Sequence, residues 1–165
     1  MRPVPEFDPR AWLLKALRET SHAMESLIWE LDEDALDERG QADEWSIRDL
    51  VLHMCEMERR HVERLERMAR VDEPKISAFD GDSIEPRAEY EDASAFELMD
   101  EFGTHRQQAV YLLWSLDEAD WERRGIHPYL GPLSILDCAR EMNEHDLSHL
   151  WQLRRMCDSF TAAAV

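Results

Sequence analysis

Residues 133–160 have the sequence LSILDCAREMNEHDLSHLWQLRRMCDSF, a long stretch with the periodicity of an amphipathic helix. The apolar positions of one helical face recur three to four residues apart, or at multiples of that step: Cys138, Met142, Leu153, Met156 and Phe160. His145 and His149 lie on the same face, one helical turn apart. Two imidazoles in this arrangement can share a metal ion. The stretch therefore predicts a helix that carries a candidate metal site.

The composition predicts an acidic globular protein. The chain has 165 residues, enough for one domain with its own core, and we expect a single domain over residues 1–165. The net charge is -18, with Lys and Arg dispersed among carboxylates, which argues against nucleic acid and anionic membranes as partners. The three cysteines show no C-x-x-C spacing, which argues against a disulfide framework and a thiolate zinc site. We expect a soluble, cytoplasmic protein, because the sequence has no signal-peptide core and no membrane-spanning stretch.

Three further amphipathic patterns precede the stretch at the C-terminal end. We predict helices at residues 9–35, 46–70 and 92–116. Ser46 has an acidic residue three positions later, which is the spacing of a capping box, and Ser94 repeats the pattern. Both serines therefore mark helix starts.

The connections between these helices are polar or contain glycine and proline. We predict loops at residues 32–44, 71–90 and 117–132, and a frayed end at residues 161–165. The connection at 71–90 is longer than adjacent antiparallel helices need, which indicates a crossover. The predicted fold class is all-α: a four-helix bundle with long crossover connections.

A third imidazole would complete the candidate metal site. His53 lies on the second predicted helix and His127 lies on the loop before the last helix, and either could converge on the pair. Three neutral imidazoles bind Zn²⁺, Ni²⁺ or Fe²⁺ and leave at least one position for water or substrate. For His22, His61 and His105 we expect ordinary hydrogen-bonded or surface positions.

Three acidic residues are candidates for roles beside the imidazoles. Asp49 lies four residues before His53, and Glu141 lies four residues before His145. Each carboxylate could accept the second ring N–H of its histidine, the usual partner of a metal-bound imidazole, although Asp49 also has a capping role. Glu56, one turn after His53, is a candidate general base, and packing or solvent exposure is the alternative for it.

Three segments occur in a diagnostic order. Residues 45–53 have the pattern W-S-x-x-D-x-x-x-H, residues 127–134 have the sequence HPYLGPLS, and residues 145–153 have the pattern H-D-x-x-H-x-x-Q-L. These segments resemble the W-S-x-x-E/D-x-x-x-H, H-P-x-x-G-x-L-S and H-D-x-x-H-x-x-Q-[IL] motifs of the DinB-like (DinB/YfiT) superfamily. The resemblance covers residues 12–156, and the ordered combination is more specific than any one motif.

The resemblance implies a bundle of up-down-down-up topology, a divalent metal held by His53, His145 and His149, and a homodimer. Characterised members of this family include transferases and isomerases that use low-molecular-weight thiols such as mycothiol, bacillithiol or glutathione. The leading expectation is therefore a metal-dependent enzyme that transfers a small thiol to a small electrophile. The alternatives are a metal-dependent hydrolase, a non-enzymatic metal-stabilised binding or dimerisation module, and histidines that only form hydrogen bonds within the bundle.

Overall fold

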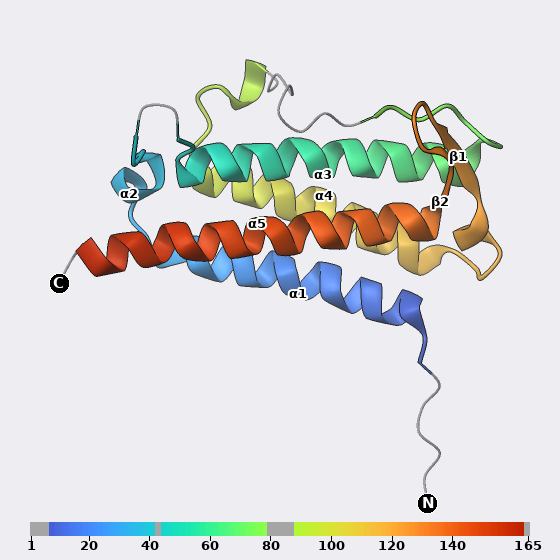
Figure 1. Cartoon of the computed structure of the whole chain (residues 1–165), viewed down its shortest axis with the longest axis horizontal. Coiled ribbons are helices and arrows are strands. Elements are labelled where there is room, and N and C mark those ends of the chain that lie inside the picture. The colour runs from blue at the N-terminus through green and yellow to red at the C-terminus, as the bar shows by residue number, and fades with distance from the viewer. Residues whose placement is uncertain (1–6, 42–43, 79–87, 164–165) are drawn as a thin grey trace, which may run out of the picture.

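The computed structural model describes residues 7–41, 44–78 and 88–163. Four long helices form a bundle (Figure 1): α1 (Pro9–Trp29), α3 (Ile47–Arg70), α4 (Ala95–Ser115) and α5 (Ile135–Ala163). The smaller elements are α2 (Glu33–Asp37), the 3₁₀ turns η1 (Ala88–Tyr90) and η2 (Asp120–Glu122), and the strands β1 (Arg124–His127) and β2 (Gly131–Ser134). Every helix in the described part of the chain is too short or too polar to span a membrane.

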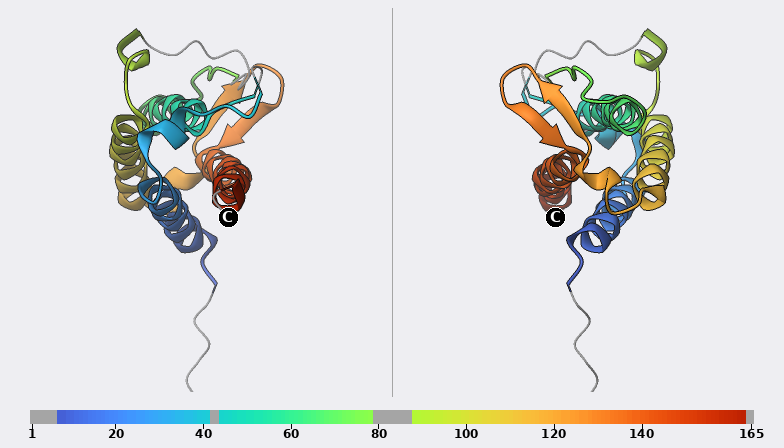
Figure 2. Two further views of the ribbon diagram at one scale, coloured as in Figure 1. Left: turned by 90° about the vertical axis from the view of Figure 1, so that its left-hand side faces the viewer. Right: turned by 90° about the vertical axis from the view of Figure 1, so that its right-hand side faces the viewer.

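The four long helices follow the expected up-down-down-up order. Helices α1 and α5 run in one direction, and α3 and α4 run in the other (Figure 1). Both α4 and α5 contact α1 and α3, so the sequential helices α1 and α3 lie on a diagonal of the bundle (Figure 2). Because α3 and α4 are parallel, the connection between them must return along the bundle, which explains its length. Part of that connection, residues 79–87, lies outside the described residues.

Both predicted capping boxes are present. The Ser46 side chain accepts a hydrogen bond from the Asp49 backbone N–H at 3.1 Å, and the Asp49 carboxylate accepts one from the Ser46 N–H at 2.9 Å. Ser94 and Glu97 form the same pair of bonds at the start of α4. Each box satisfies backbone donors that the first helical turn leaves without a partner, so these helices begin where their sequence predicts.

Two predicted boundaries are wrong. The first helix ends at Trp29 rather than near residue 35, and Asp32 then caps the separate short helix α2 by accepting from the Ala35 N–H at 2.9 Å. The last helix remains helical to Ala163, past the predicted start of the frayed end at residue 161.

The predicted loop at residues 117–132 contains an unpredicted hairpin. Strands β1 and β2 pair antiparallel, with His127 opposite Gly131, and Gly131 has a φ of 75° that suits glycine at the turn. Ile126 is also bonded to the chain after α3, because its N–H donates to the Pro74 carbonyl at 2.8 Å. The hairpin therefore joins the segments that follow α3 and precede α5.

The core consists of two apolar clusters separated by a polar layer. One cluster includes Met24, Cys55, Phe102 and Leu153, and the other includes Leu17, Val62, Ala109 and Met142. Between these positions, each of the four long helices contributes at least one buried polar side chain: Thr20, Glu58, His61, Arg106 and Asp146. Burial of polar groups is tolerated only where they find partners, so this layer is a specific feature of the bundle.

Candidate metal centre

His53, His145 and His149 converge between α3 and α5. The Nε2 atoms of His53 and His145 are 3.0 Å apart. One ring nitrogen from each of the three histidines can be chosen so that all three lie within 4.8 Å of one another. The two helices are antiparallel and packed together, which brings a residue near the start of α3 beside residues in the middle of α5. Of the two candidates for the third imidazole, the structure places His53 beside the pair.

A hydrogen bond determines the tautomer of His149. Its Nδ1 atom lies 2.9 Å from the Oε1 atom of Gln152, one turn later on α5. An amide oxygen only accepts, so Nδ1 of the neutral ring carries the hydrogen and Nε2 keeps its lone pair. Gln152 therefore has the role that a histidine ligand requires of its neighbour.

The surroundings keep the His145 and His149 imidazoles in the neutral, electron-donating form. Burial, with smaller contributions from the neighbouring His149 and His53 rings, lowers the pKa of His145 to about 3. Burial also lowers the pKa of His149. The proton therefore competes weakly for these nitrogens near pH 7.

This donor set fits a divalent transition-metal ion. Neutral imidazole nitrogens suit Zn²⁺, Ni²⁺ and Fe²⁺, whereas Mg²⁺ and Ca²⁺ prefer oxygen ligands. Two ring nitrogens at 3.0 Å both direct a lone pair into one space unless a hydrogen or a cation lies between them. A shared cation satisfies all three rings at once.

The two predicted orienting carboxylates have other partners. The Asp49 carboxylate caps α3 and forms an ion pair with Arg39 at 2.7 Å. The Glu141 carboxylate forms an ion pair with Arg64 at 2.8 Å. Gln152, which does contact His149, was missed by spacing arguments that considered only acidic residues. The glutamine of the third sequence segment was the signal that could have found it.

The remaining candidates occupy different positions. Glu56 is buried on α3 and its carboxylate accepts a hydrogen bond from Arg59 at 3.0 Å, which favours a packing role. His127 lies on β1, where its Nδ1 atom accepts from the Tyr129 and Leu130 N–H groups of the hairpin turn. His61 is 2% exposed, and its ring centroid lies 6.3 Å from that of His145. The structure thus places His61 in the polar layer and His127 in a structural turn.

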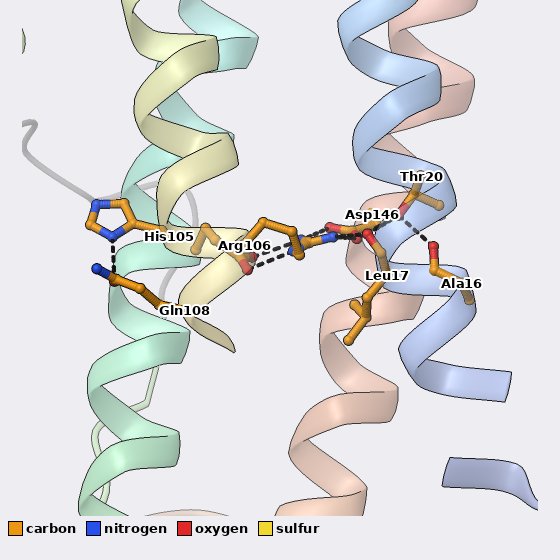
Figure 3. A network of polar contacts seen from close by, with 8 residues as sticks. Ala16, Leu17, Thr20, His105, Arg106, Gln108 and Asp146 are labelled. Atoms are coloured by element: carbon orange, nitrogen blue, oxygen red, sulfur yellow. Dashed lines mark hydrogen bonds and ion pairs between the residues drawn. The ribbon is translucent and has the colours of Figure 1, made fainter. Parts of the chain in front are cut away.

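Arg106 on α4 holds the polar layer together (Figure 3). Its guanidinium donates to the Glu58 carboxylate on α3 at 2.6 and 2.7 Å, and to the Asp146 carboxylate on α5 at 2.6 and 3.0 Å. It also donates to the Leu17 carbonyl on α1 at 2.7 Å, and the Thr20 hydroxyl donates to Asp146 at 2.9 Å. All four long helices therefore meet at one buried guanidinium.

This network adjoins the histidine site. Asp146 directly follows His145, and Glu58 lies five residues after His53 on the same helix. Arg106 therefore fixes α3 and α5, which carry the three histidines, relative to α4. Arg106 could not be singled out from the sequence, because a lone cation on an apolar helix face does not reveal which carboxylates it meets.

The chain also matches a known family. Residues 16–153 match the sequence profile of the DinB superfamily. The chain belongs to the DinB superfamily. The resemblance inferred from three short segments is thereby confirmed. No protein with curated functional data matches this DinB chain.

Two solved structures from Bacillus subtilis have the same fold as this DinB chain. YfiT, a probable metal-dependent hydrolase with an unusual four-helix bundle topology, has a TM-score of 0.80 and 13% identity, over 98% of this chain and 94% of YfiT. The DinB-like protein YjoA has a TM-score of 0.64 and 13% identity, over 91% of this chain and 92% of YjoA. At this identity the likeness shows the fold alone.

A pocket opens beside the histidine site of this DinB chain. Its volume is about 490 Å³, and it is lined by Glu44, Trp45, His149, Gln152 and Met156. The Trp45 ring centroid also lies 5.2 Å from that of His53. A small molecule in the pocket would therefore contact one candidate ligand directly and lie next to the tryptophan that packs on another.

Proposed function

We propose that the chain is a divalent-metal-dependent enzyme that acts on a small molecule, with His53, His145 and His149 as the metal ligands. The observation that carries the proposal is the convergence of three imidazoles, with one nitrogen from each within 4.8 Å. Gln152 holds the His149 ring in the tautomer that frees Nε2. The adjoining pocket could hold a substrate beside the metal, which favours a catalytic metal site over a purely structural one.

The residues around the site have separable roles in this proposal. A divalent metal held there lowers the pKa of a thiol or a water molecule, so that a nucleophile is available near neutral pH. Trp45 and Met156 supply apolar surface to the pocket. Arg106 keeps α3 and α5 at the separation that the three ligands need.

Thiol transfer is the reaction we favour. A thiolate sulfur forms a bond to the electrophilic carbon of the second substrate, and the bond from that carbon to its leaving group breaks. The leaving group departs with the bonding electron pair, and the thiol proton passes to solvent. The expected thiol is a low-molecular-weight one, as the resemblance to thiol-using members of the DinB-like superfamily implies, and the pocket of about 490 Å³ can hold a molecule of that size. Hydrolysis is the second candidate, supported by the fold shared with YfiT.

Metal analysis tests the ligand assignment. Protein purified without a His tag is loaded with Zn²⁺, Ni²⁺ or Fe²⁺, dialysed, and its bound metal is measured. We expect wild-type protein to retain close to one ion per chain and the His53→Ala/His149→Ala variant to retain none. His127→Ala is the matched control, since it removes an imidazole from the hairpin turn. Unchanged metal in the double variant would refute the assignment.

A substrate panel separates the reaction classes. Metal-loaded protein is incubated with several small thiols and either monochlorobimane or an epoxide, and in parallel with simple esters and amides. Thiol consumption faster than with the triple-histidine variant supports transfer, and ester or amide cleavage supports hydrolysis. If neither reaction exceeds that variant, the protein is a metal-stabilised module and the enzymatic proposal fails.

We also propose that the chain forms a homodimer in the cytoplasm. Exposed aromatic side chains on α1 and α4 offer an apolar contact surface: Trp12, Tyr111 and Trp114 are 56%, 69% and 70% exposed. The cytoplasmic location is supported by the three cysteines, which form no disulfide in the described structure, as suits a reducing compartment.

Light scattering tests the dimer. The Tyr111→Ser/Trp114→Ser variant is expected to shift the protein from dimer toward monomer.

A further inference from the structure

The pocket beside the three histidines has a defined chemical character. Three of its lining residues lie on α5 at the helical spacing of one face: His149, Gln152 and Met156. The other two, Glu44 and Trp45, come from the segment that leads into α3. The pocket therefore lies between one end of α3 and the middle of α5, next to the candidate metal ligands.

Part of the pocket lining is apolar and could contact the non-reacting part of a substrate. The Trp45 indole is 38% exposed although its ring lies 5.2 Å from the His53 ring, so part of its surface is left uncovered by the fold. Met156 faces the same space with a flexible, polarisable thioether. An aromatic ring and a methionine together suit aromatic or aliphatic groups of varied shape.

The charge of the pocket comes from Glu44. Among the described residues that line it, Glu44 is charged and none carries a positive charge. Two arginines close in sequence to Glu44 have partners outside the pocket. Arg48 donates to the carbonyls of Tyr90, Glu91 and Ala93, and Arg39 is paired with Asp49. The chain as a whole carries a net charge of -18, which adds a repulsive field for any anion.

We propose that this pocket binds the body of a small apolar substrate, and that Glu44 favours a neutral or cationic group over an anionic one at the end remote from the histidines, where the charge of a bound metal acts least. The inference rests on the proposed function, because the reacting end of the substrate is taken to lie at the histidines. One carboxylate at about 6 Å in a watery environment changes the affinity for a unit charge by about threefold. Between a cationic and an anionic molecule of the same shape, the difference is then about tenfold.

A matched series of metal-binding probes tests the charge preference. Benzohydroxamate, 4-(aminomethyl)benzohydroxamate and 4-carboxybenzohydroxamate share one metal-binding group and differ in the charge at the far end. Each is titrated into the cobalt(II)-loaded protein, and the visible absorption of cobalt reports binding without any turnover. We expect the cationic probe to bind about tenfold more tightly than the anionic one.

Two variants assign the preference to Glu44. Glu44→Gln is expected to reduce the ratio of the anionic to the cationic dissociation constant by about threefold to tenfold. Glu118→Gln removes the same charge from an 87% exposed carboxylate that pairs with Arg10 in α1, and it is expected to leave the ratio unchanged. An equal change in both variants would overturn the assignment to Glu44.

Trp45→Ala tests the apolar part of the pocket. Benzohydroxamate is expected to bind wild-type protein more tightly than acetohydroxamate does, and the variant should lose most of this difference. If the wild-type protein binds cobalt but shows no preference for charge or ring, the inference is overturned and the metal site stands. If cobalt does not bind, the proposed function is overturned and the inference is overturned with it.

Discussion

Arg106 donates two hydrogen bonds to Asp146, at 2.6 and 3.0 Å, and Asp146 is the residue that directly follows His145 in α5. The same guanidinium donates two hydrogen bonds to Glu58 on α3. The pair of helices that presents the three imidazoles is thus held by one cation from a third helix. Burial raises the pKa of Glu58 while the Arg106 charge opposes that rise, so the network is sensitive to loss of the cation.

Replacement of Arg106 should therefore destabilise the bundle strongly. We expect Arg106→Met to reduce the free energy of unfolding by about 3–5 kcal/mol, because it leaves Glu58 and Asp146 buried without their cation. Urea denaturation measures the change. The triple variant Arg106→Met/Glu58→Leu/Asp146→Leu should recover part of the loss, since it buries no carboxylate. A triple variant that is less stable than Arg106→Met would contradict this explanation.

Gln152 should control metal affinity without being a ligand. Gln152→Leu removes the acceptor of the His149 Nδ1–H, and we expect the dissociation constant for Zn²⁺ to rise about 10- to 100-fold. Competition with a chromogenic chelator measures it. Gln152→Glu keeps an acceptor oxygen and is expected to retain most of the affinity. Equal losses in both variants would show that the hydrogen bond does not matter.

Buried His61 should make the metal-free protein sensitive to acid. Burial lowers its pKa well below the ordinary value of 6.5. Below about pH 6.5 the His61 imidazole is protonated in the unfolded chain but stays neutral in the folded chain. The contribution of His61 to the free energy of unfolding is therefore fully present above about pH 6.5 and is lost as the pH falls. Below about pH 6, wild-type protein should lose up to about 1.4 kcal/mol more per pH unit than His61→Leu. Urea titrations between about pH 7.5 and 5 measure the two slopes, and parallel slopes would refute the prediction.

The cysteines should be unreactive in the folded protein. Burial raises the pKa of Cys55 to about 12 and that of Cys138 to about 11, and burial also raises the pKa of Cys157. Because the thiolate is the reactive form, a thiol reagent such as Ellman's reagent should react slowly at pH 8 and rapidly in urea, where all three thiols become accessible. Rapid reaction of the native protein would show that the bundle opens locally.

Local signals made most of the fold predictable from the sequence. Capping pairs such as Ser46 with Asp49 act within four residues, and the apolar period of each helix is a local property. The hairpin escaped prediction because its strands have four residues each, and Pro132 weakens the strand pattern of the second. Its pairing with Pro74 is a long-range contact that no local pattern contains.

The site was only partly predictable for a similar reason. The spacing of His145 and His149 within one helix defines their shared face, but the choice between His53 and His127 depends on how separate elements pack. The likeness to the DinB-like motifs favoured His53, and in the structure the His53 ring lies beside the rings of His145 and His149. The partners of Asp49 and Glu141 are arginines distant in sequence or on another element, so spacing alone could not reveal them.

The polar layer also limits how the four helices can slide past one another. A shift of α5 by one turn, about 5.4 Å, would move Asp146 out of reach of Arg106 and leave a charge buried without a counterion. Leucine and methionine contacts alone would tolerate such slippage, because one apolar turn resembles the next. The longitudinal alignment of the bundle, and with it the meeting of imidazoles from positions 92 residues apart, is therefore encoded by electrostatics rather than by shape.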